Sequence, residues 1–172
     1  RLVYDAPKDG VIAALAGVKS DIKARVFGSG GWSRWDGIAY ATQDGRRLAA
    51  FQLGNRSGNY RLAGQAYAGS LLTGTAAQAV GETLSVLYDG TFAGNVFKGR
   101  LRAAGAAFRA SAEGELNLAE NTADTLRVKA KLLQPALVLA TPELAGVDID
   151  ATLDGAFDDL AIEHTVAVER LK

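Results

Sequence analysis

The chain has 172 residues, and its 19 Lys and Arg are balanced by 19 Asp and Glu, so there is no net positive charge to hold a nucleic acid. Cysteine is absent and histidine occurs once, which excludes disulfides and zinc ribbons and argues against a His-based catalytic dyad or metal cluster. Hydrophobic residues make up 48% of the chain, too many for a disordered segment.

The N-terminal part is expected to begin the β structure. Residues 9–18 fit either a short helix or an apolar strand. Ile22, Ala24 and Val26 alternate with charged residues, which is typical of a half-buried strand. The glycine-rich residues 28–32 follow, and they predict a turn or a bulge.

Asp-Gly pairs between alternating segments predict hairpins, because a type I′ turn needs positive φ at both central residues. They occur at residues 44–45, 89–90 and 154–155, and in weaker contexts at 9–10 and 36–37. If residues 44–45 form a two-residue loop, Tyr40 lies opposite Ala49 and Ile38 lies opposite Phe51. This register predicts one apolar face, which Leu53 continues.

The middle of the chain continues this pattern with little helix. Expected strands run through Tyr60 and Leu62, residues 84–88, 116–118, 126–132 and 136–140. Residues 75–80 fit a single helical turn, and Pro142 is expected to begin a turn.

The last hairpin, within residues 148–168, has two possible registers. A turn at Asp154–Gly155 pairs Ile149 with Leu160, and a turn at Asp158–Asp159 pairs Ile149 with Val168. We prefer the second because it gives longer strands. Because the side-chain period is two, both registers leave the same residues on one apolar face, namely Ile149, Leu160, Ile162, Val166 and Val168. The acidic residues are interpreted as turn formers and solvent-face residues.

We find no group of residues that supplies a nucleophile, a base and an orienting group together, so we expect neither an enzyme nor a cofactor. His164 has the apolar parity and is interpreted as a packing residue. Trp32 and Trp35 are interpreted as rim or core residues, with a sugar clamp or a membrane-interface position as the alternative.

About ten strands joined by short turns predict an all-β fold, a curved and mainly antiparallel sheet with minor helix at most. The apolar face must be covered, either by folding over on itself or by a ligand. An open concave face would suit acyl chains, whereas a closed one would be a filled β-sandwich. The residues leave these two alternatives open.

Residues 148–171, DIDATLDGAFDDLAIEHTVAVERL, resemble the repeating unit of the TamB and AsmA-like proteins of the Gram-negative envelope. In those repeats a strand ends in Leu-x-Gly-x-x-Asp-Asp and a strand of alternating apolar residues follows. Leu153, Gly155, Asp158 and Asp159 match the motif, and Leu160 stands where many repeats have proline. Residues 112–132 are similar in style.

The resemblance implies a U-shaped "β-taco" sheet with an apolar groove, in a protein that is anchored in the inner membrane and reaches across the periplasm. We therefore expect residues 1–172 to be a single repetitive segment of a longer protein, with its membrane anchor outside this segment. The implied partners are phospholipid and an outer-membrane β-barrel of the TamA type. The residues expected to line the groove are Ile38, Tyr40, Phe51, Leu53, Ile149, Leu160, Ile162, Val166 and Val168.

Two other functions are considered for the same residues. The first is a filled-core β scaffold or surface-adhesin module that binds a protein through exposed strand edges. The second is a chaperone that pairs its sheet edge with outer-membrane strands.

Overall fold

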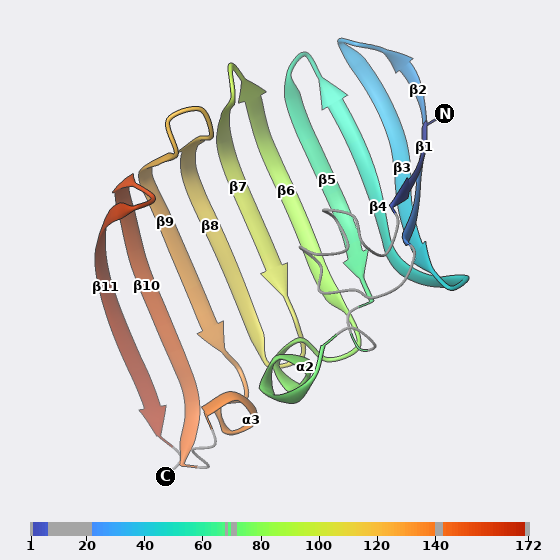
Figure 1. The fold of residues 1–172 in the computed structure, drawn as a ribbon. Coiled ribbons are helices and arrows are strands. Elements are labelled where there is room, and N and C mark those ends of the chain that lie inside the picture. Colours follow the sequence, from blue (N-terminus) through green and yellow to red (C-terminus); the bar gives the residue numbers. More distant parts are fainter. Residues whose placement is uncertain (1, 7–21, 68, 70–71, 140–142, 171–172) are drawn as a thin grey trace.

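The computed structural model describes residues 2–6, 22–67, 69, 72–139 and 143–170. Its strands form one eleven-stranded sheet in which every strand pairs with its neighbours in sequence, in the order β1 to β11. All of these pairings are antiparallel. The sheet is open and curved (Figure 1). The expectation of an all-β, curved antiparallel sheet is therefore confirmed.

The strands are β1 (Leu2–Ala6), β2 (Ile22–Gly31), β3 (Arg34–Gln43), β4 (Arg46–Arg56), β5 (Asn59–Ala66), β6 (Leu84–Ala93), β7 (Val96–Ala104), β8 (Phe108–Asn117), β9 (Thr122–Leu132), β10 (Leu144–Ala156) and β11 (Asp159–Arg170). Two short helices, α2 (Gly74–Val80) and α3 (Pro135–Leu139), interrupt the meander after β5 and after β9.

The two ends of the strands differ. At the end drawn at the top of Figure 1, called the hairpin end below, short turns join β2 to β3, β4 to β5, β6 to β7, β8 to β9 and β10 to β11. The helices lie at the opposite end, the helix end. There α2 packs against α3. The amide of Ala107 donates to the Ala79 carbonyl at 2.9 Å, and the amide of Leu133 donates to the Ala107 carbonyl at 2.7 Å.

The Asp44–Gly45 hairpin forms as predicted, but a β-bulge beside it changes the register. Both loop residues have positive φ, 49° and 76°, and the strands pair Thr42 with Arg47. The register then shifts by one residue at Leu48, which is buried against Ile22. Because one extra residue reverses the parity of everything beyond it, the predicted pairing of Ile38 with Phe51 is wrong.

The other Asp-Gly predictions within the described residues are also wrong, because those pairs lie inside β3, β6 and β10. The pair at 9–10 lies outside the described residues. In β6, Asp89 faces Arg61 and Arg100 on the adjacent strands. The β6–β7 turn is instead Gly94–Asn95, with φ of 57° and 67°. A Gly-Asn pair satisfies the same turn requirement as Asp-Gly.

Two further predictions need correction, whereas the helical turn expected at residues 75–80 lies within α2. Residues 135–139 form α3 and not a strand. The last hairpin takes neither predicted register, because its loop is Phe157–Asp158 and Ala156 pairs with Asp159. The Phe157 amide donates to the Asn121 carbonyl at 2.8 Å, which ties this loop to the β8–β9 turn. The alternative that residues 9–18 form a helix or a strand lies outside the described residues.

The described residues enclose little core. Their buried hydrophobic residues are Ile22, Leu48, Ala107, Ala123 and Val147, together with the fully buried Pro135. Several large hydrophobic residues of the strands stay about half exposed, among them Leu101, Ile162 and Val166. Among the described residues no second layer covers the sheet, and its two faces carry the candidate site.

Candidate functional site

One face of the sheet is apolar from β2 to β11. The pairing registers connect one residue of each strand into a row that crosses the sheet and contains only apolar residues: Val26, Ala39, Phe51, Gly64, Val86, Ala103, Ala110, Ala130, Ile149 and Val166. The parallel row two residues nearer the hairpin end is apolar except for Tyr88 and, at its edge, His164: Gly28, Gly37, Leu53, Leu62, Tyr88, Leu101, Ala112, Val128, Ala151 and His164. We call this the apolar face.

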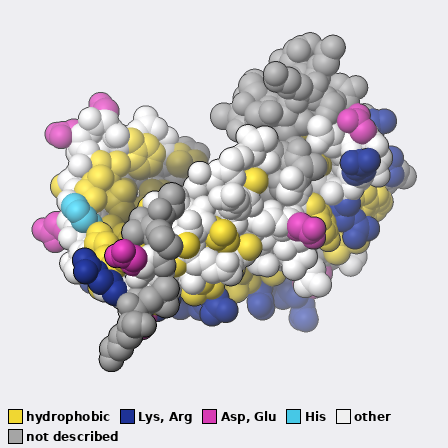
Figure 2. All heavy atoms as spheres, turned by 90° about the horizontal axis from the view of Figure 1, so that it is seen from below, with side chains coloured by type: hydrophobic (Ala, Val, Ile, Leu, Met, Phe, Trp, Pro, Cys, Tyr) yellow, Lys and Arg dark blue, Asp and Glu magenta, His cyan; other side chains and the backbone are white. Residues whose placement is uncertain are grey.

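The opposite face is charged, and we call it the charged face. A row that crosses it alternates in sign over the central strands: Arg61, Asp89, Arg100, Glu113 and Arg127. Opposite charges on adjacent strands stabilise a sheet face exposed to water. Viewed along the strands, hydrophobic side chains gather at the upper left, towards the C-terminal strands, and Lys and Arg project along the lower side (Figure 2).

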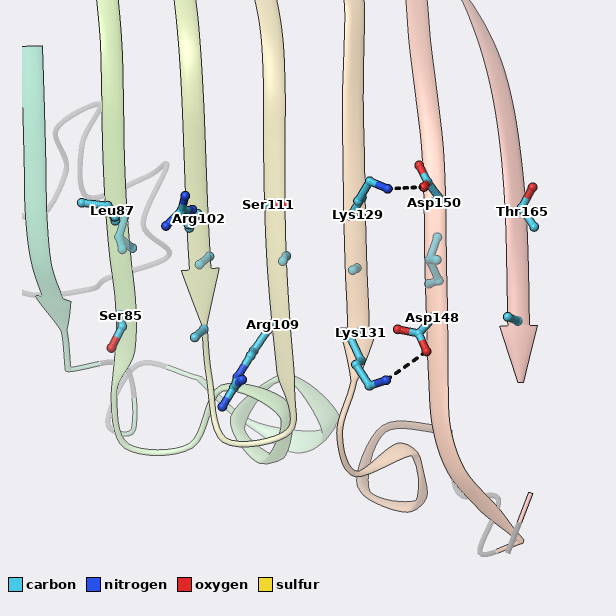
Figure 3. A pocket seen from close by; sticks show the side chains of 17 residues that line it. Ser85, Leu87, Arg102, Arg109, Ser111, Lys129, Lys131, Asp148, Asp150 and Thr165 are labelled. Atoms are coloured by element: carbon cyan, nitrogen blue, oxygen red, sulfur yellow. Dashed lines mark hydrogen bonds and ion pairs between the residues drawn. The ribbon is translucent and has the colours of Figure 1, made fainter. Parts of the chain in front are cut away.

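The charged face has hollows of its own. Charged side chains line those over β5 to β11, whereas the one over β3 to β6 is lined mainly by uncharged residues, among them Ile38 and Tyr40. One of the charged hollows, of about 630 Å³, extends from β6 to β11. Lys129 points towards Asp150 at 2.7 Å and Lys131 towards Asp148 at 3.1 Å, while Arg109 lies on the adjacent β8 and Arg102 on β7 (Figure 3). An acyl chain would have to desolvate these groups to lie there. Of the two faces, the apolar one is therefore the candidate lipid site.

The residues expected to line a groove divide between the two faces. Those on the apolar face are Phe51, Leu53, Ile149, Leu160, Ile162, Val166 and Val168. Ile38 and Tyr40 lie on the charged face, where they pair with Gln52 and Ala50. The prediction that these two residues share one face with Phe51 and Leu53 is wrong, because the bulge at Leu48 reverses the parity between β3 and β4.

An aromatic cavity of about 720 Å³ lies on the apolar face at the hairpin end, within the usual size range of ligand sites, roughly 300–1,000 Å³. Its large apolar side chains come from β3 to β7 and from the β2–β3 turn: Trp32, Trp35, Leu53, Tyr60, Leu62, Tyr88, Phe92 and Phe97. The rings of Phe92 and Phe97 are 4.3 Å apart, and Phe97 meets Tyr88 edge-on at 6.4 Å. Of these residues, sequence reasoning placed only Leu53 at the site.

Glycines let the aromatic side chains lie flat on the sheet. Gly28 and Gly37 pair with one another, and the indole of Trp35 covers both. A Cβ at Gly37 would lie 2.5 Å from Cη2 of Trp35, and one at Gly28 would meet the same ring. Likewise, a Cβ at Gly90 would lie 2.7 Å from the Tyr88 hydroxyl. A glycine pair beside an aromatic residue is a signal for this arrangement that the sequence did contain.

The phenol of Tyr88 has a raised pKa. Burial raises it above its ordinary value of 10.0, and the Asp89 carboxylate raises it further. The Tyr88 hydroxyl donates to the Thr91 carbonyl at 3.3 Å. Its neutral form therefore contributes stability that is present below about pH 10 and is lost as the pH rises through the raised pKa.

We expect the pKa of Tyr88 to lie above its ordinary value of 10.0, and Tyr88→Phe to remove the corresponding transition. Ultraviolet absorbance during an alkaline titration measures this. Tyr60→Phe is the matched control because Tyr60 lines the same cavity. If that transition persisted in Tyr88→Phe, the proposed burial of this phenol would be wrong.

The described residues contain no cluster of three or more His, Asp or Glu that could hold a metal ion. His164 lies opposite Ala151 on the apolar face but is exposed, so its interpretation as a packing residue is wrong. No helix within the described ranges is both long and apolar enough to cross a membrane.

No family model, curated protein or solved structure matches this chain.

Proposed function

We propose that this segment carries phospholipid acyl chains along its apolar face, as one part of a periplasmic protein that bridges the inner and outer membranes. The observation that carries the proposal is the apolar row from Val26 to Val166, which crosses ten strands without a polar side chain. A face of this size needs a cover of matching chemistry.

Acyl chains suit this face because it is chemically uniform. Its side chains are aliphatic, aromatic or absent, and they vary in size but offer few hydrogen bonds. Each methylene group buried against them contributes roughly 0.8 kcal/mol, so a tail needs no specific polar contact to be held. A headgroup would remain in water beside the face. Passive movement along the row requires no catalytic residue.

The place of this segment in a cell follows from the TamB and AsmA-like resemblance of residues 148–171. On that basis the longer protein is anchored in the inner membrane outside this segment. Its partner at the outer membrane is a β-barrel of the TamA type. Assistance with outer-membrane protein assembly belongs to the same proposal.

The outer edge of β11 supports a second candidate, binding of a protein strand. Almost every residue from Asp159 to Arg170 is exposed, and within the described residues β11 pairs only with β10. An unpaired edge of this length is a template for β-strand addition. The related scaffold hypothesis also requires a filled core. The few buried side chains among the described residues do not support such a core.

The test is to purify the chain from a Gram-negative periplasm, extract it with organic solvent, and quantify bound lipid by mass spectrometry. We expect phospholipid in stoichiometric amount. A folded protein without lipid would contradict the proposal, and binding of outer-membrane strand peptides by the lipid-free protein would favour the second candidate.

A further inference from the structure

Large apolar side chains are exposed at every hairpin of the hairpin end. We call them the hairpin row, and they are Trp32 of the β2–β3 turn, Tyr60 next to the β4–β5 turn, Phe92 next to the β6–β7 turn, Leu118 of the β8–β9 turn and Phe157 of the β10–β11 loop. Trp32 is 97% exposed, and the others are between 40% and 48% exposed. Turns are ordinarily polar, so one such residue at each successive hairpin is a pattern that strand formation does not require.

The row follows the curved hairpin end of the sheet (Figure 1). Adjacent strands lie about 4.8 Å apart, so five successive hairpins cover roughly 40 Å measured along that end. By contrast, the β3–β4 turn at the helix end is polar: it consists of Asp44 and Gly45, and Gln43 and Arg46 flank it. A line of apolar side chains along one end of a sheet fits a flat apolar boundary better than it fits a compact pocket.

The chemistry of the row favours a lipid surface. Trp and Tyr are the residues that concentrate at the boundary between headgroups and acyl chains. Near two of the hairpins the charges are paired, Arg56 with Asp36 at 2.7 Å and Lys98 with Glu115 at 3.4 Å. Glu120 beside Leu118 and Asp158 beside Phe157 are in none of the salt bridges of the described residues. The row therefore has no cluster of positive charge for an anionic lipid surface, and this favours a zwitterionic one.

The row is also continuous with the aromatic cavity, because Trp32, Tyr60 and Phe92 belong to both. We propose that the hairpin end docks on a zwitterionic phospholipid bilayer, with the side chains of the hairpin row in the boundary between headgroups and tails. This docking would open the cavity towards the acyl chains of the bilayer. That last step rests on the proposed function, whereas the docking itself does not.

The test is flotation with phosphatidylcholine vesicles. We expect the wild-type chain to float with them, and Leu118→Ser with Phe157→Ser to weaken the binding about tenfold or more, because two partly exposed side chains no longer gain from burial. Neither residue lines the aromatic cavity. The matched control is Leu137→Ser with Leu139→Ser at the helix end, since both leucines are similarly exposed and two large apolar side chains are again replaced by serine. The control should bind as the wild type does.

A second readout locates Trp32. In a Trp35→Phe background it is the single tryptophan of the chain, and its fluorescence should shift to the blue and be quenched by brominated acyl chains when vesicles are added. The proposal is overturned if the wild type does not float, if the hairpin-row variant binds as well as the wild type, or if the control loses binding equally. Concentration-dependent self-association without flotation would also overturn it and would make the row a protein interface.

Binding of a monomeric fluorescent fatty acid without vesicles separates this inference from the proposed function. We expect the Leu118→Ser, Phe157→Ser variant to retain that binding. Vesicle binding without fatty-acid binding would leave the docking standing and contradict the acyl-chain function. Fatty-acid binding without vesicle binding would contradict the docking and leave the acyl-chain function standing.

Discussion

Replacing Ile149 and Val166 together by aspartate is expected to strip phospholipid from a chain that still folds. The two residues pair directly across β10 and β11 in the middle of the apolar row, so two carboxylates would face each other where a tail is proposed to lie. Burying even an uncharged polar group without a partner costs roughly 2–7 kcal/mol. We therefore expect at least about a tenfold loss of bound lipid, measured by extraction and mass spectrometry.

The matched control is Thr152→Asp with Ala167→Asp. It places the same charges on the same two strands but on the charged face, where Thr152 lies between Arg127 and Glu163. Because Val166 is 52% exposed and lies on the edge strand, the fold should tolerate both variants. Circular dichroism checks this. Equal lipid loss in the two variants would show that charge, and not the apolar face, decides the binding.

Gly28→Val is expected to displace Trp35 and deform the aromatic cavity. The indole covers Gly28 and its pairing partner Gly37, so a valine side chain cannot occupy the same space. Forcing extra atoms into a packed contact costs typically about 1–3 kcal/mol. We expect a loss of this size in the free energy of unfolding by denaturant, and a changed tryptophan emission in the folded protein.

Gly31→Val is the control for that substitution, because it changes the same residue type on the same strand. No other atom lies within 4 Å of a Cβ built at Gly31, so the free energy of unfolding should change by about 0.5 kcal/mol or less. A similar loss in both variants would mean that glycine in β2 matters for backbone reasons and not for the position of Trp35.

The sequence predicted the all-β class because alternation with a period of two does not depend on an exact register. The last hairpin illustrates this. Its observed loop, Phe157–Asp158, differs from both predicted turns by an even shift in pairing, and so Ile149, Leu160 and Val166 keep their common face. The neighbouring acidic residues reach the charged face for the same reason, where Asp148 and Asp150 meet lysines of β9.

Irregularities of a single residue, such as a β-bulge, could not be predicted from the alternation of apolar and polar residues. The bulge at Leu48 depends on its burial against Ile22, a contact between β4 and β2 that local alternation does not report. It moved Ile38 and Tyr40 to the charged face. In the same way, Asp89–Gly90 has the composition of a turn but lies within β6, where Asp89 is in register with Arg61 and Arg100 on the adjacent strands.

The aromatic cavity was missed because its residues come from separate turns and strands that only the pairing order brings together. Trp32 and Tyr60 are 28 positions apart (60 minus 32), yet both line the cavity. The glycines that give Trp35 its position were read as turn or bulge signals. Glycine opposite glycine on neighbouring strands, next to an aromatic residue, would have been the better indication.

The most direct measurement of acyl-chain binding is site-specific photo-crosslinking in the full chain, produced in a Gram-negative periplasm. A photoreactive phenylalanine derivative would be placed at Leu153, between Leu126 and Ile162 on the apolar face, or at Thr152, its neighbour on the charged face. If the apolar face carries acyl chains, illumination yields phospholipid adducts at Leu153 and only background at Thr152. Absence of adducts at Leu153, or equal adducts at both positions, would contradict the proposed function.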